Sequence, residues 1–253
     1  MSFVGDLGRG PGFLALGWRL LATSGVRPLL VWPLLVTFLV YAGTVAAVLV
    51  PTMDWLENAV SDLPQWFHDW FGFLVTLLEV LLGLLLVLLV GWVALLLAGV
   101  LASPFYGRIA ALVEARLRGR ASTVERGIAR EAWAAIGREF QKLAWTLPRM
   151  LAILILGLLP VLNTIASPLA FLFGAWVMTA QFTDFTPENR GLPFAATRSD
   201  LRGRRGLGLG FGIPLALGLG IPLLNLLVAP AAVAGGTALW LRIRGEWDGT
   251  RGI

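Results

Sequence analysis

The most prominent feature of the chain is a long apolar run from Val80 to Leu101, which contains no charged residue. As a helix this run would extend about 33 Å, enough to cross the ~30 Å hydrocarbon core of a bilayer. A second uncharged run, from Pro28 to Val50, is also long enough to cross. The pattern therefore predicts two transmembrane helices within residues 28–102.

Amphipathic patterns flank these two spans. Within the N-terminal segment 1–27, residues 3–21 place aromatic and aliphatic side chains among sparse charges, which is typical of a helix in the membrane interface. The rest of the segment forms the loop before the first span. In residues 103–149, Glu114 and Arg118 have the spacing of a helical ion pair. This stretch is predicted to form cytoplasmic amphipathic helices, which rest on the membrane or present ordinary solvated surface. Its apolar stripe consists of Ile109, Leu112, Val113 and Leu117.

Two later apolar segments are similar to each other. Residues 160–163 (PVLN) and 222–225 (PLLN) begin patterns of proline, asparagine, alanine and glycine that match at one constant offset. The match predicts an internal repeat, in which residues 150–183 and 206–241 form two helical hairpins. The first arm of hairpin one, residues 150–159, would extend about 15 Å, so this hairpin is predicted to be re-entrant.

The asparagines of the repeated motif have two interpretations. Non-helical turns at membrane depth need protein or water around them, so Asn163 and Asn225 could line an aqueous pathway. Each asparagine could instead cap the helix that follows its turn. In hairpin two, the glycines of the run at 206–212 are spaced four apart, which predicts close packing between helices.

Charged residues are distributed asymmetrically. Residues 51–70, predicted to be an external loop, hold acidic side chains and no Lys or Arg, whereas every basic residue lies before Pro28 or after Leu101. By the positive-inside rule, both termini are predicted to be cytoplasmic. Residues 184–205 are predicted to form a cytoplasmic linker and residues 242–253 a polar tail. The first residues lack the pattern of a signal peptide.

Composition supports this picture and excludes several function classes. With 57% hydrophobic and 14% charged residues and a net charge of +5, the chain has too few polar side chains to cover a soluble globule. Cytoplasmic loops and anionic lipids account for the basic excess, so no nucleic-acid partner is predicted. Cysteine is absent and His68 is the single histidine. No catalytic residue, metal or cofactor is therefore predicted, and the chain is not expected to be an enzyme.

The best candidate for chemistry immediately precedes the first span. The backbone N–H groups of Gly25, Val26 and Arg27 can converge at a helix N-terminus, where the helix dipole and the guanidinium attract an anion. Many helices begin in this way, so the pattern also fits an ordinary helix start. Near the outer end of the second span, Glu79 is either a functional intramembrane acid or a side chain that snorkels to the boundary.

Several longer stretches together resemble one family. They are SGVRP (24–28), ASPFYGRIAALVEARLRG (102–119), REFQKLAWTLPR (138–149), FTDFTPENRGLPF (182–194) and IPLLNLLVAPAAVAGGTALW (221–240). In these stretches the chain resembles the CysZ family of bacterial sulfate permeases. The resemblance implies sulfate uptake across the inner membrane for cysteine biosynthesis, by a homo-oligomer built from two long spans and two partly penetrating hairpins.

The resemblance also implies a location for sulfate. The family's G-[LIV]-R-R loop falls on Gly25, Val26 and Arg27, and Pro28 replaces its second arginine. This replacement removes one charge and one N–H donor, so the site is expected to be weaker or to be completed by another group. By position and charge, Arg149 and Arg190 are the candidates for that group.

The sequence thus predicts an all-α integral membrane protein with a single membrane domain over residues 1–253. The expected function is sulfate permeation, channel-like or secondary, without an ATP-binding loop, with sulfate and membrane lipids as partners. The alternative is a non-transporting scaffold or assembly protein whose basic cytoplasmic face binds lipid or a partner. Candidate pathway residues are Asn163, Asn225, Arg149, Arg190 and Glu79.

Overall fold

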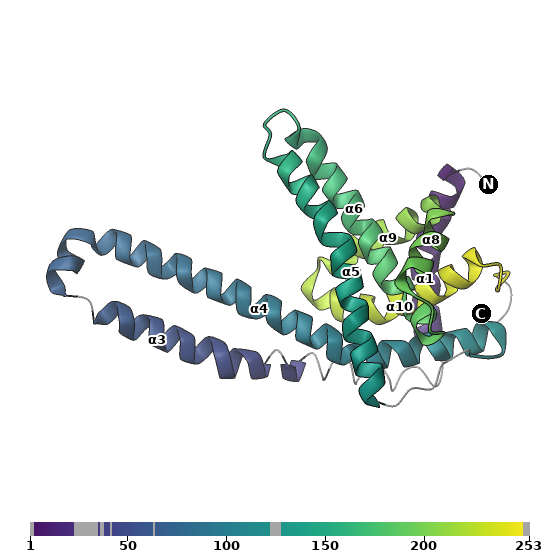
Figure 1. Cartoon of the computed structure of the whole chain (residues 1–253), viewed down its shortest axis with the longest axis horizontal. Coiled ribbons are helices and arrows are strands. Elements are labelled where there is room, and N and C mark those ends of the chain that lie inside the picture. The colour runs from purple at the N-terminus through teal and green to yellow at the C-terminus, as the bar shows by residue number, and fades with distance from the viewer. Residues whose placement is uncertain are drawn as a thin grey trace. The chain divides into compact units, whose positions relative to one another are not determined.

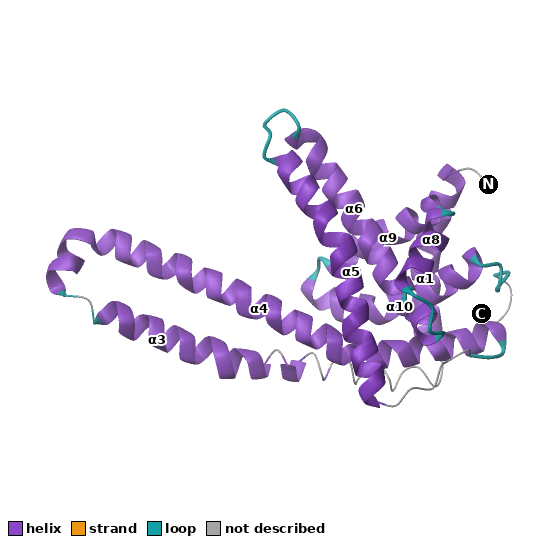
Figure 2. Ribbon diagram, in the orientation of Figure 1, coloured by secondary structure: helices purple, strands orange, loops and turns teal. Residues whose placement is uncertain are grey.

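The computed structural model describes residues 3–22, 35, 38–40, 42–62, 64–121 and 128–249, and within these ranges it is helical and contains no strand (Figures 1 and 2). The all-α prediction is confirmed for this part of the chain. The elements are α1 (Phe3–Leu21), a π-helical turn η1 (Val45–Leu49), α3 (Val50–Ser61), α4 (Gln65–Arg118), α5 (Ile128–Gly157), α6 (Asn163–Thr183), α7 (Phe185–Asn189), α8 (Phe194–Arg202), α9 (Arg205–Leu219) and α10 (Pro222–Ile243).

Three described stretches are long and apolar enough to cross a bilayer, namely Phe38–Ser61, Phe71–Gly91 and Asn163–Asn189. The first two agree with the prediction that residues 28–102 contain two transmembrane helices, although residues 28–34 lie outside the described part. The third stretch contains the second arm of predicted hairpin one and continues past it to Asn189. The first arm, predicted over residues 150–159, is the end of the continuous helix α5 (Ile128–Gly157), so no separate short helix begins at residue 150.

The acidic segment 51–70 was predicted to be a loop, and this prediction is wrong. Helix α3 continues to Ser61, and α4 already begins at Gln65. A helix can carry Asp54 and Glu57 here because both residues are exposed, so neither charge is removed from water by packing within the chain.

The chain forms two compact units, residues 32–102 and residues 1–31 with 103–253. In the first unit, α3 and the early part of α4 touch where Met53 meets Gly83, whose added Cβ would lie 3.3 Å from the methionine methyl. Among the residues of this unit whose side chains are described, most large apolar ones are exposed, for example Phe73, which is 80% exposed, and Leu88. Such a surface suits a lipid environment, because helices satisfy their own backbone groups and need only apolar contacts outside.

The second unit has a helical core built around α10. Helix α1 packs on α9 and α10, and α6 packs on α9 and α5. From the predicted stripe on α4, Ile109, Val113 and Leu117 are buried in this core, whereas Leu112 is exposed. The contacts of α1 also bury Asp6, which lies 3.4 Å from Arg204. Whether α1 lies in the membrane interface stays a prediction.

Glycines on α9 allow two backbones to approach it from different sides. A Cβ added at Gly210 would overlap the carbonyl oxygen of Leu7 on α1. A Cβ at Gly212 would overlap the backbone of Ala175 on α6. The Thr179 hydroxyl on α6 also donates to the Gly208 carbonyl at 2.6 Å. The close helix packing predicted from the four-residue spacing is therefore confirmed.

The repeated proline and asparagine motif occupies different positions in its two copies. Helix α6 begins at Asn163, with Leu162 at the N-cap and no side-chain capping hydrogen bond. Helix α6 thus begins at the asparagine of its motif, whereas helix α10 begins at the proline of its motif, Pro222. Proline is tolerated at a first helical position, because the N–H that it lacks would have no partner within the helix. The capping interpretation of Asn163 is therefore wrong. Asn163 is exposed, and the Ser167 hydroxyl donates to its carbonyl oxygen at 3.2 Å.

The C-terminal residues were predicted to form a polar tail, but the described part of this segment packs against the core. Helix α10 continues to Ile243. Beyond it, Trp247 is only 6% exposed and belongs to the same hydrophobic cluster as Trp240. Burial of an indole supplies enough apolar contact to hold a short segment that local sequence patterns would leave in solvent.

The glycine contacts predict opposite effects for one substitution at two helical sites. Gly210→Ala should destabilise the protein by about 1–3 kcal/mol, because the new methyl group meets backbone atoms that cannot move aside cheaply. Gly8→Ala on α1 should be neutral or stabilising by up to about 1 kcal/mol, since nothing lies within 4 Å of its Cβ position. Thermal unfolding in detergent checks both variants, and equal midpoints would contradict the packing.

Candidate functional site

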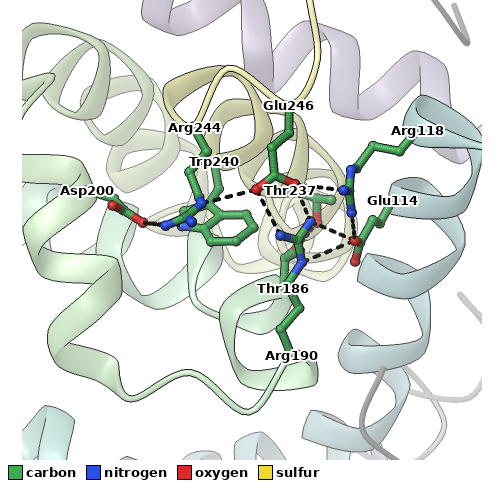
Figure 3. A network of polar contacts seen from close by, with 9 residues as sticks. All are labelled: Glu114, Arg118, Thr186, Arg190, Asp200, Thr237, Trp240, Arg244 and Glu246. Carbon is green, nitrogen blue, oxygen red and sulfur yellow. Dashed lines mark hydrogen bonds and ion pairs between the residues drawn. The ribbon is translucent and has the colours of Figure 1, made fainter. Parts of the chain in front are cut away.

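A polar assembly that joins four parts of the second unit is drawn in Figure 3. Arg190 follows α7, Glu114 and Arg118 come from α4, and Asp200 comes from α8. The other members come from the C-terminal end of α10 and the segment after it. We call this assembly the Arg190 network. Its members are Glu114, Arg118, Arg190, Asp200, Trp240, Arg244 and Glu246.

Arg190 occupies the centre of the network and uses all of its nitrogen atoms. Its Nε and Nη2 donate to Oε1 of Glu114 at 3.1 and 2.7 Å. Its Nη1 and Nη2 donate to the two carboxylate oxygens of Glu246 at 3.0 and 2.8 Å. Two-oxygen pairing with Glu246 matches the planar fork of a guanidinium and fixes its orientation.

Arg118 closes the same group from the α4 side. Its Nη1 lies 2.7 Å from Oε1 of Glu114, which confirms the ion pair predicted from the four-residue spacing. Its Nη2 lies 3.1 Å from Glu246. Residues of α4, the segment after α7 and the segment after α10 are therefore tied together at one point (Figure 3).

Trp240 forms an aromatic platform beneath the network. The Cζ atoms of Arg190 and Arg244 lie 4.5 and 5.2 Å from its ring centroid. The indole Nε1 donates to Asp200 at 3.0 Å, and Arg244 contacts both Asp200 and Glu246. As drawn, the network contains three arginines and three carboxylates, so its formal charges cancel.

Electrostatic interactions within the network favour the charged forms of Arg190 and Glu246. Burial acts to lower the pKa of Arg190, but its hydrogen bonds with Glu246 and Glu114 outweigh burial, and the pKa is raised. The hydrogen bond from Arg190 lowers the pKa of Glu246 in spite of partial burial. An anion could reach Arg190 only by replacing one of these carboxylates, so the network acts first as a structural clamp.

A second polar group, the Asp184 cluster, lies at the junction of α6 and α7. Asp184 is fully buried and accepts two hydrogen bonds from Arg138 of α5, both at 2.6 Å. The Thr197 hydroxyl of α8 donates to the same carboxylate at 2.6 Å. Lys142 lies 3.4 Å from Asp184 and 2.8 Å from Glu139. The cluster holds the junction against α5 and α8.

Arg138 remains charged in this buried position. Burial acts to lower its pKa, but the hydrogen bonds and the charge of Asp184, with the charges of Glu188 and Glu139, raise it above the ordinary arginine value. Such a bidentate pair is strongly interdependent, because either partner alone would be a buried, uncompensated charge.

The predicted sulfate-binding residues Gly25, Val26 and Arg27 lie outside the described residues. Glu79 lies in α4 and Asn225 in α10, but their side chains are not among those described. The remaining candidates engage separate partners. Arg190 lies in its network, whereas Arg149 of α5 is exposed and its Cζ lies 5.1 Å from the Trp145 ring centroid.

Several interacting residues were missed by the sequence analysis. The spacing of Glu114 and Arg118 signalled one local pair, but Glu246 lies in the segment read as a tail. Asp184 and Arg138 are far apart along the chain, and no local pattern indicates their pairing. In the described part, no group of three or more histidine or acidic residues could hold a metal ion.

The described part of the chain defines a helical protein with three stretches long and apolar enough to span a membrane. The family model described as "Sulfate transporter CysZ/Etoposide-induced protein 2.4" matches residues 13–230. A protein of Pseudomonas paraeruginosa (strain DSM 24068 / PA7) named "Sulfate transporter CysZ" is 35% identical over 245 residues, covering 94% of this chain and 96% of the relative. The chain belongs to this CysZ/EI24 family, and the resemblance read from the sequence is confirmed.

The Arg190 network predicts a large cost for neutralising its most buried carboxylate. Glu114→Gln should destabilise the protein by about 3–5 kcal/mol, because Arg190 and Arg118 would lose the charge that compensates their burial. Glu57→Gln makes the same chemical change at an exposed position and should have little effect. Thermal unfolding of both purified variants is the measurement. A Glu114→Gln midpoint equal to that of Glu57→Gln would show that the network contributes no stability.

The lowered pKa of Glu246 predicts a loss of stability in acid. The ionised Glu246 carboxylate adds to the free energy of unfolding. This contribution is fully present above the ordinary glutamate pKa of 4.5 and is lost as the pH falls through the lowered pKa of the folded state. Unfolding midpoints measured from about pH 6 to about pH 3 should fall less steeply for Glu246→Gln than for the native chain. Identical slopes would remove Glu246 as a source of the pH dependence.

Proposed function

We propose that the chain is a sulfate permease of the bacterial inner membrane that supplies sulfate for cysteine biosynthesis. The observation that carries this proposal is the match to a protein named for sulfate transport over 94% of the chain. A match of this extent includes the spans, the predicted hairpins and the loop before the first span. The similarity therefore extends over the whole chain and is not limited to one segment. The helices with spanning potential supply the membrane location that the proposal requires.

Sulfate would be bound at Gly25, Val26 and Arg27. A dianion that enters a membrane protein must exchange its water for other donors, and backbone N–H groups at a helix start with one permanent cation provide them. Pro28 supplies no N–H donor and no charge, which keeps the site weaker than one with two arginines. Modest affinity suits transport, since a tightly held ion would not leave.

The proposed architecture has two long spans and two hairpins that enter the membrane part of the way. Helix α9 of hairpin two supports partial entry, because Arg205–Leu219 is apolar but shorter than a span. At the turn of hairpin one, Leu158 and Val161 are highly exposed, at 75% and 85%. These side chains would contact lipid or another copy in a homo-oligomer. Both termini would be cytoplasmic.

The proposed pathway leads from the sulfate site past the hairpin turns, by way of Asn163, Asn225, Arg149, Arg190 and Glu79. The permease would be channel-like or secondary. Exposure of Asn163 and Arg149 supports their access to a passing ion. Arg190 is paired with Glu114 and Glu246. It would therefore contribute either by releasing one of these carboxylates and binding the passing sulfate in its place, or by fixing the helices that surround the pathway.

Removing the one cation of the proposed site should impair uptake. In proteoliposomes, Arg27→Ala should lower radiolabelled sulfate influx and weaken sulfate binding about tenfold or more, through the loss of charge-assisted hydrogen bonds. Arg108→Ala removes the same charge from an exposed position on α4 and should retain native flux.

Uptake by the native chain no greater than that of empty vesicles would overturn the permease proposal and favour a scaffold or assembly role. Native flux in Arg27→Ala would instead overturn only the assigned site. Comparing flux with and without a pH gradient separates the two transport mechanisms, because only proton-coupled transport responds directly to the gradient.

A further inference from the structure

A third polar group lies where α5 packs against α8, and it differs in composition from the other two. We call it the Arg198 cluster. It consists of Trp145 and Arg149 on α5 and of Arg198 and Arg202 on α8. Its aromatic floor is part of a hydrophobic cluster that also contains Phe194 and Leu201, so the platform is fixed by packing.

Two of the three arginines lie over the Trp145 ring. The Cζ atoms of Arg149 and Arg198 lie 5.1 and 5.6 Å from its centroid, and Arg198 also lies 5.4 Å from the centroid of Phe194. The two rings meet edge to face, with centroids 6.0 Å apart. Stacking on aromatic faces orients a guanidinium and leaves N–H groups at its edge that can donate. In Arg149, Nη1 already donates to the Trp145 backbone carbonyl, which leaves its other N–H groups for a ligand.

Two buried donors in this cluster lack an acceptor. Neither Nε of Arg198 nor Nε1 of Trp145 has a hydrogen-bond partner among the residues that the structure describes. Leaving a buried donor unpaired is costly, and native proteins rarely do so without a reason. Both donors belong to side chains that touch each other, which indicates one missing acceptor group and not two unrelated packing faults.

The charge balance points in the same direction. In the Arg190 network and the Asp184 cluster, every arginine contacts a carboxylate. Among described residues, no carboxylate forms an ion pair with Arg149, Arg198 or Arg202. Burial, together with the positive charges of Arg202 and Arg149, lowers the pKa of Arg198. Arg198 is therefore repelled by both neighbouring arginines, and a shared anion would relieve this repulsion.

We propose that the Arg198 cluster binds a tetrahedral oxyanion, a sulfate or a phosphate group. Arg198 and the Trp145 indole would supply the two buried donors, while Arg149 and Arg202 would enclose the anion from the more exposed side. Several acceptor oxygens on one small group match the several donors that converge here. This inference concerns binding only and does not depend on the proposed transport function.

The location of the cluster identifies two sources for such an oxyanion. Arg149 directly precedes the apolar arm that starts at Met150, along which Leu154 and Leu158 are exposed. If that arm contacts lipid, the cluster lies at the level of the head groups, where a lipid phosphate can reach it. Free sulfate from the aqueous side is the other source.

The test uses the purified full chain carrying Arg27→Ala, so that the proposed sulfate site before the first span does not contribute. Sodium sulfate is titrated by calorimetry, and phosphatidylglycerol in mixed micelles is titrated by native mass spectrometry. We expect Arg198→Ala and Arg149→Ala each to bind at least one of the two probes about tenfold more weakly than the parent, because charge-assisted hydrogen bonds are removed.

The variants also separate binding from folding. Arg108→Ala, an equal loss of charge on exposed surface, should leave the affinity of both probes unchanged. Trp145→Phe keeps an aromatic ring and removes only the Nε1–H donor, and should weaken the same probe. Without ligand, Arg198→Ala should unfold at no lower temperature than its parent, because it removes an unpaired buried donor. Exposed Arg202→Ala supplies the affinity test should Arg198→Ala fold poorly.

The outcomes assign the source or reject the site. A loss confined to sulfate identifies a free-anion site, and a loss confined to phosphatidylglycerol identifies a lipid head-group site. Native affinity for both probes in Arg149→Ala, Arg202→Ala and Trp145→Phe would overturn the proposal. So would losses no greater than that of Arg108→Ala.

Discussion

A guanidinium can leave water only where other groups replace its hydration, and this constraint organises the unit formed by residues 1–31 and 103–253. Arg190 and Arg138 meet that requirement with carboxylates from other helices. Each pairing is therefore also a connection between elements. The two clusters hold the end of α6 and the segment after it to α4, α5, α8 and the C-terminal segment, and the hydrophobic core around Trp240 packs among these connections.

Close backbone contact supplies the second means of assembly. Lipid offers little hydrophobic incentive for helices to associate, so dispersion contacts between glycine-rich faces become important. Helix α9 uses one face toward α1 and another toward α6, with Gly210 and Gly212 at the contacts. Apolar packing and ion pairing thus act on the same helices: α6 contacts α9 near Gly212 and is held at its end by Asp184.

The contrast among the three polar groups bears on function. Where carboxylates accompany arginines, the charges are neutralised within the protein and the group stabilises the fold. Around Trp145 the arginines have no such counterpart in the described part, and two buried donors remain unpaired. A protein proposed to handle a dianion would thus have two kinds of positive site: a helix-start loop at residues 25–27, and a guanidinium group on an aromatic platform. The former would use backbone donors and the latter side chains.

By itself, the sequence determined what depends on neighbouring residues. Apolar length predicted the spanning helices, four-residue spacing predicted both the glycine contacts of α9 and the pair of Glu114 with Arg118, and local motifs indicated the family. Prediction from the sequence was wrong where a local pattern was ambiguous. The acidic segment 51–70 was predicted to be a loop but is largely helical, and the segment after residue 241 was predicted to be a tail but packs against the core. Only the tertiary structure decided that Glu246 meets Arg190, that Asp184 meets Arg138 and that Arg198 lies over Trp145. Such pairings join helices distant in the chain, and their energies depend on burial and orientation, which residue order alone does not encode.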